Sequence, residues 1–293
     1  MTEEMAKTIK FGEGEFLSAA EGGDVVRSSP TSVVVVAGMA RSGKTTLVAG
    51  LYDLFHKGPF AGYLFAWCRT LPGFERRSHL ARLCSERENP DTERTGHSES
   101  HDLLHLQLAE ASNGDRHDIL FSDIWGEAFR LASDSAEECQ KITILKRADH
   151  VVILVDGKKA IIKKERQGAF AAVDSLLRQC LDSGMLDQTS NVQIVLTKWD
   201  EVAGHGDAFI EEKFKWLSDR HRDKLATLTT HKAALRSSGA IKAGCGMEEL
   251  LRTWMVVQNR YSSPSAADRS SYYSEFDRLD STWPISTSRG THE

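Results

Sequence analysis

A glycine-rich loop follows four consecutive valines at positions 33–36 of the chain. Its spacing is Gly38-x-x-x-x-Gly43-Lys44, with Thr45 directly after the lysine. Glycines at this spacing let backbone N–H groups surround phosphate oxygens, and the helix expected next adds further N–H donors. Lys44 is suited to the outer phosphates, and the Thr45 hydroxyl is suited to Mg²⁺. The loop therefore predicts a nucleoside triphosphate site built from Gly38, Arg41, Ser42, Gly43, Lys44, Thr45 and Thr46.

A carboxylate ends a second apolar stretch, in the sequence FSDIWGE at 121–127. Asp123 would hold Mg²⁺ through water, and the N–H group of Gly126 would meet the outermost phosphate. Glu127 can orient or deprotonate an attacking water, although its charge would repel a triphosphate. Alternatively, Glu127 is a surface carboxylate that caps the following helix. Lys44, Gly126 and Glu127 are therefore the candidate catalytic residues.

A third motif, IVLTKWD at 194–200, carries Thr197, Lys198 and Asp200 after another apolar stretch. The Asp200 carboxylate can accept hydrogen bonds from N1–H and the exocyclic amine of guanine. Adenine does not offer these donors, so an unpaired buried charge would penalise it. The Lys198 stem can lie along the base, and the backbone near Ser238 can touch it. Three such motifs at the carboxyl ends of strands predict a GTP pocket.

Strand-like and helix-like segments alternate along the chain and must position these motifs. The apolar stretches at 33–37 and 150–155 are typical of the buried centre of a parallel sheet, which favours an α/β fold. Further strands are predicted at 103–109, 118–122, 192–197 and 232–236. Helices are predicted at 45–56, 165–183, 207–225 and 247–257.

Three regions fall outside this alternation. Residues 1–30 predict a flexible arm with one short element, and the Ser-rich residues 259–293 predict a partner-docking or disordered tail. Between them, 31–258 form the predicted nucleotide-binding domain, with 57–101 as a long insertion. The insertion predicts an extended segment followed by a helix. Its six arginines are mixed with glutamates and predict a solvated, salt-bridged helix, with an arginine acting in catalysis as the alternative.

The composition indicates a soluble globular protein. The chain has 293 residues, 40% hydrophobic and 27% charged, and its net charge of −5 argues against direct nucleic-acid binding. Five cysteines without a C-x-x-C pair predict reduced thiols rather than a disulfide framework or a zinc site. No stretch approaches the roughly 20 apolar residues of a transmembrane helix, and no secretory signal is evident, so a cytoplasmic location is expected.

The three motifs over about 31–258 resemble those of the Ras-like branch of the TRAFAC class of P-loop GTPases. The resemblance implies a mixed six-stranded sheet with one antiparallel strand and helices on both faces. It also implies GTP and GDP as ligands, Mg²⁺ as cofactor, and two loops that change shape on hydrolysis. The insertion stands in place of the first of these loops, where Thr92 or Thr95 would bind Mg²⁺, and Thr95 is our choice. The last motif of the class, usually Ser-Ala, is degraded to Ser238-Gly239-Ala240.

Other positions also depart from the class. The usual glutamine after the second-motif glycine is replaced by Glu127, which predicts slow intrinsic hydrolysis. Arg41 stands inside the phosphate loop, where it either neutralises phosphate charge or forms an outward salt bridge, and we favour the outward orientation. These departures leave a non-hydrolysing nucleotide-binding scaffold as an alternative to a switch. A P-loop kinase or ATPase is the further alternative.

The stretch from RSGKTTLVAGLY through PDTERT to DILFSDIWGE is similar to the bacterial double-GTPase families of biological-conflict, anti-phage-type systems. This finer resemblance implies one or more protein partners from the same system, with a second GTPase or an effector encoded nearby as candidates. The function expected from the sequence is therefore a GTP-dependent switch, with slow hydrolysis, that controls a partner protein.

Overall fold

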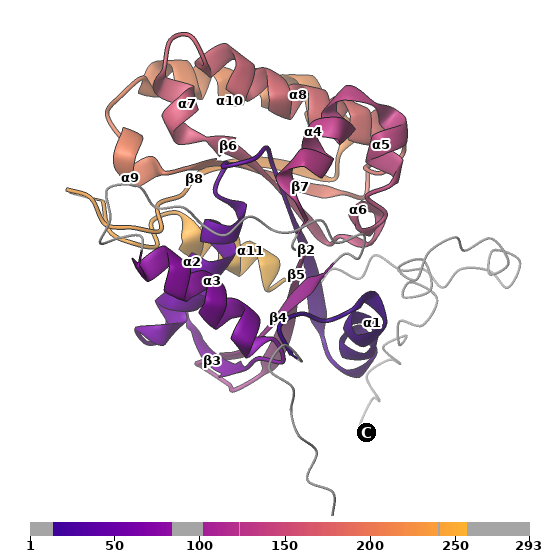
Figure 1. Ribbon diagram of the computed structural model, residues 1–293, viewed down its shortest axis with the longest axis vertical. Coiled ribbons are helices and arrows are strands. Elements are labelled where there is room, and N and C mark those ends of the chain that lie inside the picture. The colour runs from indigo at the N-terminus through magenta and orange to yellow at the C-terminus, as the bar shows by residue number, and fades with distance from the viewer. Residues whose placement is uncertain (1–13, 84–101, 123, 240, 257–293) are drawn as a thin grey trace, which may run out of the picture.

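The computed structural model describes residues 14–83, 102–122, 124–239 and 241–256. Within them, seven strands form one sheet in the order β3-β4-β5-β2-β6-β7-β8 (Figure 1). Strand β4 is antiparallel to both of its neighbours, and the pairs from β5 to β8 are all parallel. The strands are β2 (Thr31–Ala37), β3 (Tyr63–Trp67), β4 (Leu103–Glu110), β5 (Arg116–Ser122), β6 (His150–Asp156), β7 (Asn191–Thr197) and β8 (Thr227–Lys232).

The predicted class is confirmed: the sheet is mixed, has one antiparallel strand, and carries helices on both faces. The predicted number of six strands is wrong, because β3 adds a seventh at the edge of the sheet beside β4. This strand comes from the insertion at 57–101, whose first part was expected to be extended. The prediction of a strand at 232–236 is also wrong, since β8 ends at Lys232. Strand β8 is half-exposed and rich in threonine, so it lacks the apolar run that identified the central strands.

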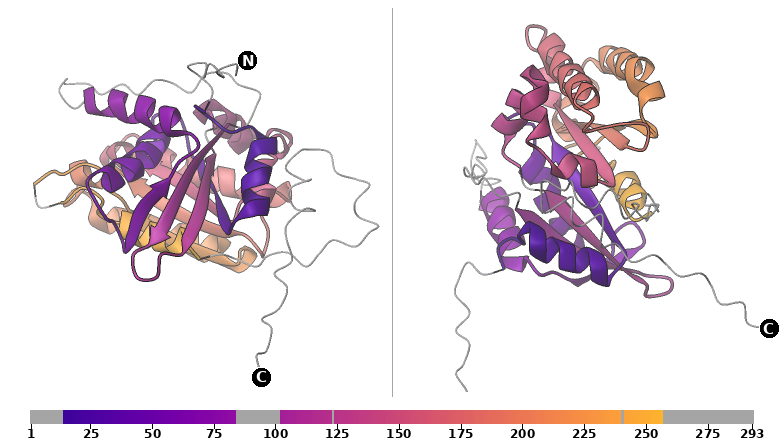
Figure 2. Two further views of the ribbon diagram at one scale, coloured as in Figure 1. Left: turned by 90° about the horizontal axis from the view of Figure 1, so that it is seen from below. Right: turned by 90° about the vertical axis from the view of Figure 1, so that its right-hand side faces the viewer.

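Helices cover both faces of the sheet (Figure 2), and a hydrophobic cluster lies on each side of it. The valines of β2 divide between them: Val33 and Val35 face one cluster, and Val34 and Val36 face the other. The first cluster is covered by α1 (Ala19–Ser28), α4 (Gly126–Asp134), α5 (Ala136–Gln140), α6 (Ile144–Arg147), α7 (Gly157–Ile161), α8 (Arg166–Asp182), α9 (Trp199–Val202) and α10 (Asp207–His221). The second is covered by α2 (Lys44–His56), α3 (Leu71–Leu83) and α11 (Met247–Trp254).

Helix α1 lies in the segment predicted as an arm with one short element. Its start is a capping box, in which the Ser18 hydroxyl accepts from the Glu21 N–H at 3.3 Å and Glu21 accepts from the Ser18 N–H at 2.8 Å. Val25 and Val26 of α1 are buried in the first cluster. This part of the segment therefore packs on the domain, whereas residues 1–13 and the predicted tail at 259–293 lie outside the described residues.

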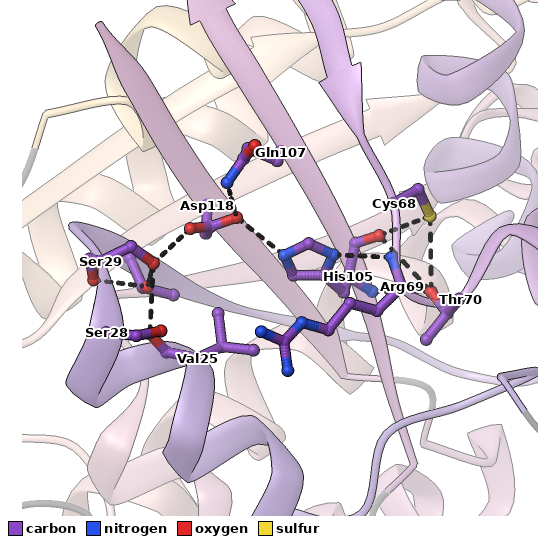
Figure 3. Close-up of polar contacts among 10 residues, drawn as sticks. Val25, Ser28, Ser29, Cys68, Arg69, Thr70, His105, Gln107 and Asp118 are labelled. Atoms are coloured by element: carbon purple, nitrogen blue, oxygen red, sulfur yellow. Dashed lines mark hydrogen bonds and ion pairs between the residues drawn. The ribbon is translucent and has the colours of Figure 1, made fainter.

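A buried polar network ties the insertion to the sheet (Figure 3). His105 of β4 bonds the Asp118 carboxylate of β5 at 2.7 Å through Nε2, and its Nδ1 accepts from the Arg69 N–H at 3.0 Å. Ser29, after α1, also donates to Asp118. The Thr70 hydroxyl accepts from the His105 N–H at 2.9 Å. The network therefore joins α1, two strands and the β3–α3 connection at one point.

Every helix in the described part of the chain is too short or too polar to span a lipid bilayer.

Candidate functional site

The predicted phosphate loop connects β2 to α2. Gly38 has φ +150°, and an added Cβ there would come within 2.6 Å of the Ser42 hydroxyl oxygen. Gly43, with φ +98°, is the N-cap of α2. These positions need glycine because an L side chain is strained at such φ values. The sequence thus shapes a loop whose backbone curls directly into the start of a helix, where N–H groups without intrahelical partners favour an anion.

The Lys44 side chain folds back onto this loop. Its Nζ donates to the carbonyl of Gly38 at 2.9 Å and lies 3.3 Å from the carbonyl of Met39. The ammonium group is therefore held over the loop, where a phosphate would be bound. Thr45 and Thr46 are half-buried in the first turn of α2. The Arg41 side chain is exposed, and Arg41 itself adopts φ +66°.

The third motif lies against the phosphate loop, although the two are far apart in the sequence. The Thr197 hydroxyl lies 2.8 Å from the carbonyl of Ser42 and 3.2 Å from the carbonyl of Val155. Lys198 adopts the left-handed conformation with φ +57°, and its Nζ donates to the carbonyl of Arg41 at 3.1 Å. The structure therefore brings the predicted phosphate-binding and base-binding motifs together at the carboxyl edge of the sheet.

Asp156 is part of this arrangement and was missed in the sequence. Its carboxylate lies 2.9 and 2.8 Å from the Lys198 Nζ, and it caps α7 by accepting from the Lys158 N–H at 3.0 Å. Asp156 pairs with Thr197 in the parallel register of β6 and β7. The sequence signal that could have identified Asp156 is a carboxylate directly after an apolar stretch, because Asp123 was chosen on the same pattern in the sequence.

Asp200 lies in the first turn of α9 and is half-buried. Burial is the main influence that raises the pKa of the Asp200 carboxyl above its ordinary value, and the Glu201 charge adds to the rise. Its own backbone N–H, Arg236 and Lys158 oppose the rise. A partly desolvated carboxylate gains more from a pair of N–H donors than an exposed one does. The half-buried position of Asp200 is consistent with the base-pairing role that the sequence predicts, and that role stays a prediction.

Ser238 lies beyond Arg236 in an exposed turn. Its N–H and carbonyl exchange hydrogen bonds of 3.0 Å with Ile241. Arg236, two residues before Ser238, acts electrostatically on the Asp200 carboxyl. The turn therefore follows directly after a residue that influences Asp200. The turn offers backbone groups, as the sequence analysis expected, while Ala240 lies outside the described residues.

The start of α4 approaches the phosphate loop closely. A Cβ added to Gly126 would lie 2.8 Å from the backbone nitrogen of Ala40 and 2.8 Å from the Lys44 Nζ. Trp125 is the N-cap residue of this helix. The Glu127 carboxylate accepts from Arg130 Nε at 2.6 Å, one turn along the same helix. In this structure Glu127 makes an ion pair at the surface within its own helix, but it does not cap α4, whose N-cap is Trp125 without a side-chain cap hydrogen bond.

Of the three predicted Mg²⁺ ligands, the structure describes only Thr45, because Thr95 and Asp123 lie outside the described residues. Ser122 and Ile124, on either side of Asp123 in the chain, line the same hollow of about 10 Å³ as Thr45. Among the described residues, the hydroxyl oxygens of Thr45 and Ser122 are hard ligands of the kind that Mg²⁺ prefers. Arg77 of α3 lines the hollow too, so the insertion brings a cation next to Thr45. Nothing in the motif spacing singled out Arg77 among the arginines of the insertion.

A larger cavity of about 290 Å³ lies between the phosphate loop and α8. Its lining includes Ser42, Leu154 and Val173, and Lys159 and Lys164 bring positive charge to it. Asp156 and Glu165 line the same cavity, so its two positive and two negative side chains balance.

A match to one protein family agrees with a nucleotide-binding domain. The model of the Double-GTPase 2 family matches residues 32–255. Among solved structures, the chain is similar to the signal recognition particle receptor SRb-GTP/SRX complex from Chaetomium thermophilum, at 14% identity and TM-score 0.42, over 76% of this chain and 96% of that one. It is also similar to the S. cerevisiae Ski7 GTPase-like domain bound to GDP and inorganic phosphate, at 12% identity and TM-score 0.43, over 85% of this chain and 50% of that one. No curated protein matches the sequence.

Proposed function

The chain belongs to the Double-GTPase 2 family, and from this premise we propose that it is a GTP-dependent switch that hydrolyses GTP slowly and controls a protein partner. The family supports GTP binding. The observation that carries the proposal is the contact of the TKxD motif with the phosphate loop, made by Thr197 and Lys198. This contact supports the proposal because it holds the predicted base-binding motif beside the predicted phosphate loop at one edge of the sheet.

Each residue of the site has a role in the proposed reaction. Lys44 and the backbone of the loop would bind the β- and γ-phosphates, and the Gly126 N–H would bind the γ-phosphate. Mg²⁺, held by Thr45 with Asp123 and Thr95, would neutralise phosphate charge. Lys198, oriented by Asp156, would lie along the base while Asp200 pairs with guanine. Loss of the γ-phosphate would remove the hydrogen bond to the Gly126 N–H. The start of α4 could then move away from the loop, and this movement is the proposed conformational signal.

Slow hydrolysis follows from the state of Glu127. Its carboxylate is paired with Arg130, so it has to leave this partner before it can position a water. Its negative charge near the triphosphate adds a further penalty. The same ion pair favours the second candidate function, a scaffold that holds a nucleotide without turnover.

The partner belongs to the proposal as well. We infer a protein partner, with a second GTPase or an effector from the same bacterial conflict system as candidates. The resemblance to the bacterial double-GTPase families supports this inference. The insertion at 57–101 and the segment at 259–293 are the candidate surfaces.

Nucleotide competition on the purified chain tests the proposal. We expect GTP and GDP to bind at least about 100-fold more tightly than ATP, because a site built for hydrogen bonds rejects ligands that lack them. Asp200→Asn should lose this preference and gain affinity for xanthine nucleotides. Glu201→Gln is the matched control, because Glu201 is an adjacent acid that pairs with Lys158 at 2.6 Å.

Equal competition by ATP, or unchanged GTP affinity in Asp200→Asn, would refute the proposed guanine site. Phosphate release from GTP in the same samples separates the two candidate functions. A slow but measurable release supports the switch, and tight binding without release supports the scaffold.

A further inference from the structure

Two cysteine thiols meet in the core between α5 and α8. The Sγ atoms of Cys139 and Cys180 are 3.0 Å apart, and the two residues are 0% and 2% exposed. Both cysteines are free in this structure. The sulfurs of a disulfide are about 2.05 Å apart, so a closer approach of about 1 Å would bring them to bonding distance. The short helix α5 packs directly on the long helix α8 (Figure 1).

We propose that Cys139 and Cys180 form a reversible intramolecular disulfide, a modification site that ties α5 to α8. The other described cysteines are placed differently. The Cys68 thiol donates to the carbonyl of His105 at 2.8 Å, and Cys245 is exposed. Cys84 lies outside the described residues.

The surroundings assign different chemical roles to the two thiols. The hydrogen bond from Cys180 lowers the pKa of the Cys139 thiol, against the effect of burial, and Ser183 lowers it further. The hydrogen bond to Cys139 and burial raise the pKa of Cys180 well above its ordinary value. Within the proposal, Cys139 is assigned as the nucleophile, since the thiolate is the reactive form, and Cys180 as the resolving thiol.

A small hydroperoxide is the oxidant that fits a buried pair. The Cys139 thiolate attacks one peroxide oxygen, the O–O bond breaks, and a Cys139 sulfenic acid forms with release of hydroxide or alkoxide, which takes up a proton. The Cys180 sulfur then attacks the Cys139 sulfur, and the sulfenic hydroxyl leaves as water with the Cys180 proton. In sum, two thiols and one peroxide give one disulfide, one water and one water or alcohol.

The consequence for switching rests on the proposed function. Helix α5 follows directly after α4, the helix that begins at Gly126 beside the phosphate loop, and Ser135 links the two. A disulfide at Cys139 would anchor the far end of this segment to α8. The oxidised protein should therefore respond less to the difference between GTP and GDP.

Alkylation of the full chain tests the disulfide directly. The protein is treated with hydrogen peroxide or with a reductant, then denatured and alkylated with N-ethylmaleimide. We expect the oxidised protein to react at three of its five cysteines and to be about 2 Da lighter before alkylation. Its non-reduced peptide map should contain one cross-link, between the peptides of Cys139 and Cys180. The melting temperature should rise by about 5 °C or more, and reductant should reverse it.

Cys139→Ala and Cys180→Ala should each abolish the cross-link, whereas Cys245→Ala is the matched control and should keep it. The peptide map of the unchanged protein decides the matter even if a core variant does not fold. Free thiols at both positions after peroxide treatment, a stable sulfinic acid at Cys139, or a cross-link between other cysteines would overturn the proposal.

Hydrogen exchange of residues 126–140 tests the effect on switching separately. In the reduced protein, exchange should differ between the complexes with GDP and with a non-hydrolysable GTP analogue, and oxidation should reduce this difference at least about threefold. An unchanged difference in a fully cross-linked sample would overturn the effect on switching. Failure to bind guanine nucleotides would overturn the proposed function, whereas the peptide map would still decide the disulfide.

Discussion

At the scale of single residues, the contact between Gly126 and the phosphate loop leaves no space for a side chain. The nearest atoms to an added Cβ are a backbone nitrogen and the Lys44 ammonium. A backbone atom cannot move aside as the end of a flexible side chain can. The absence of a Cβ at Gly126 is therefore what allows α4 to start against the loop.

Gly126→Ala should consequently weaken GTP binding more than GDP binding. The added methyl would push the start of α4 away from the γ-phosphate position, and overpacking of this kind costs roughly 1–3 kcal/mol, or about 5- to 150-fold in affinity. Titration with fluorescent GTP and GDP analogues measures the two affinities. Gly168→Ala in α8 is the control, since nothing lies within 4 Å of its added Cβ. Equal losses for both nucleotides would show that Gly126 does not report on the γ-phosphate.

Residues within a contiguous motif were predictable, and residues that act across motifs were not. The loop from Gly38 to Thr46 combines glycine, lysine and threonine in an order that has one clear physical use. The position of Asp156 at the end of an apolar strand is a weak local signal, but its pairing with Lys198 depends on β6 and β7 lying side by side. Arg77 depends in the same way on how α3 packs against α2. The spacing of residues along the sequence shows neither that β6 and β7 are adjacent nor that α3 packs against α2.

At the scale of elements, the buried network around Asp118 decides how the insertion is attached. Burial by itself would raise the pKa of the Asp118 carboxyl. Hydrogen bonds from His105, Ser29 and Gln107 outweigh this effect and hold the pKa below its ordinary value. His105 in turn accepts from the backbone of Arg69. The carboxylate therefore orients the ring that holds the β3–α3 connection in place.

Asp118→Ala should destabilise the protein by roughly 2–4 kcal/mol, because it leaves several buried donors without an acceptor. Urea denaturation followed by circular dichroism measures the change in the free energy of unfolding. Asp115→Ala, at an exposed turn before the same strand, should change it by no more than about 0.5 kcal/mol. A similarly small change for Asp118→Ala would mean that the network does not support the fold.

The sequence was informative about elements that are apolar along their whole length. Strands β2, β6 and β7 are buried on both faces, so their composition alone indicates them. Edge strands have no such signature. Strand β3 leaves Phe65 and Trp67 substantially exposed, so its segment was expected to be extended but not to be a seventh strand of the sheet. In β8, buried residues alternate with exposed polar ones, so the bounds of this strand could not be derived.

At the scale of the whole molecule, buried histidines make stability depend on pH. Burial lowers the pKa of His117, His221 and His231 below the ordinary value, and neighbouring carboxylates only partly oppose it. The unfolded chain therefore binds protons on these rings at a higher pH than the folded protein does. Folded-state stability is then fully present above the unfolded pKa of about 6.5 and falls as the pH drops below it.

The melting temperature should accordingly decrease from about pH 7 to about pH 5. Asp118 adds a further loss only below about pH 4, outside this range, because its lowered pKa contributes stability that disappears when the carboxyl is protonated. Differential scanning fluorimetry across this range checks the direction. The decrease should persist in about 0.5 M salt, which screens exposed charges but not buried rings. A melting temperature that rises toward pH 5 would contradict this account.

The double contact of the Thr197 hydroxyl, with one carbonyl of the phosphate loop and one of β6, has a further consequence. In the proposed site this contact would fix the distance between the base-binding and phosphate-binding ends before a nucleotide binds. A nucleotide of matching span then enters without ordering the site, and the entropy of association is less unfavourable. Free guanine or free pyrophosphate can occupy only one end of the proposed site. The length of the ligand therefore contributes to selectivity, together with its base.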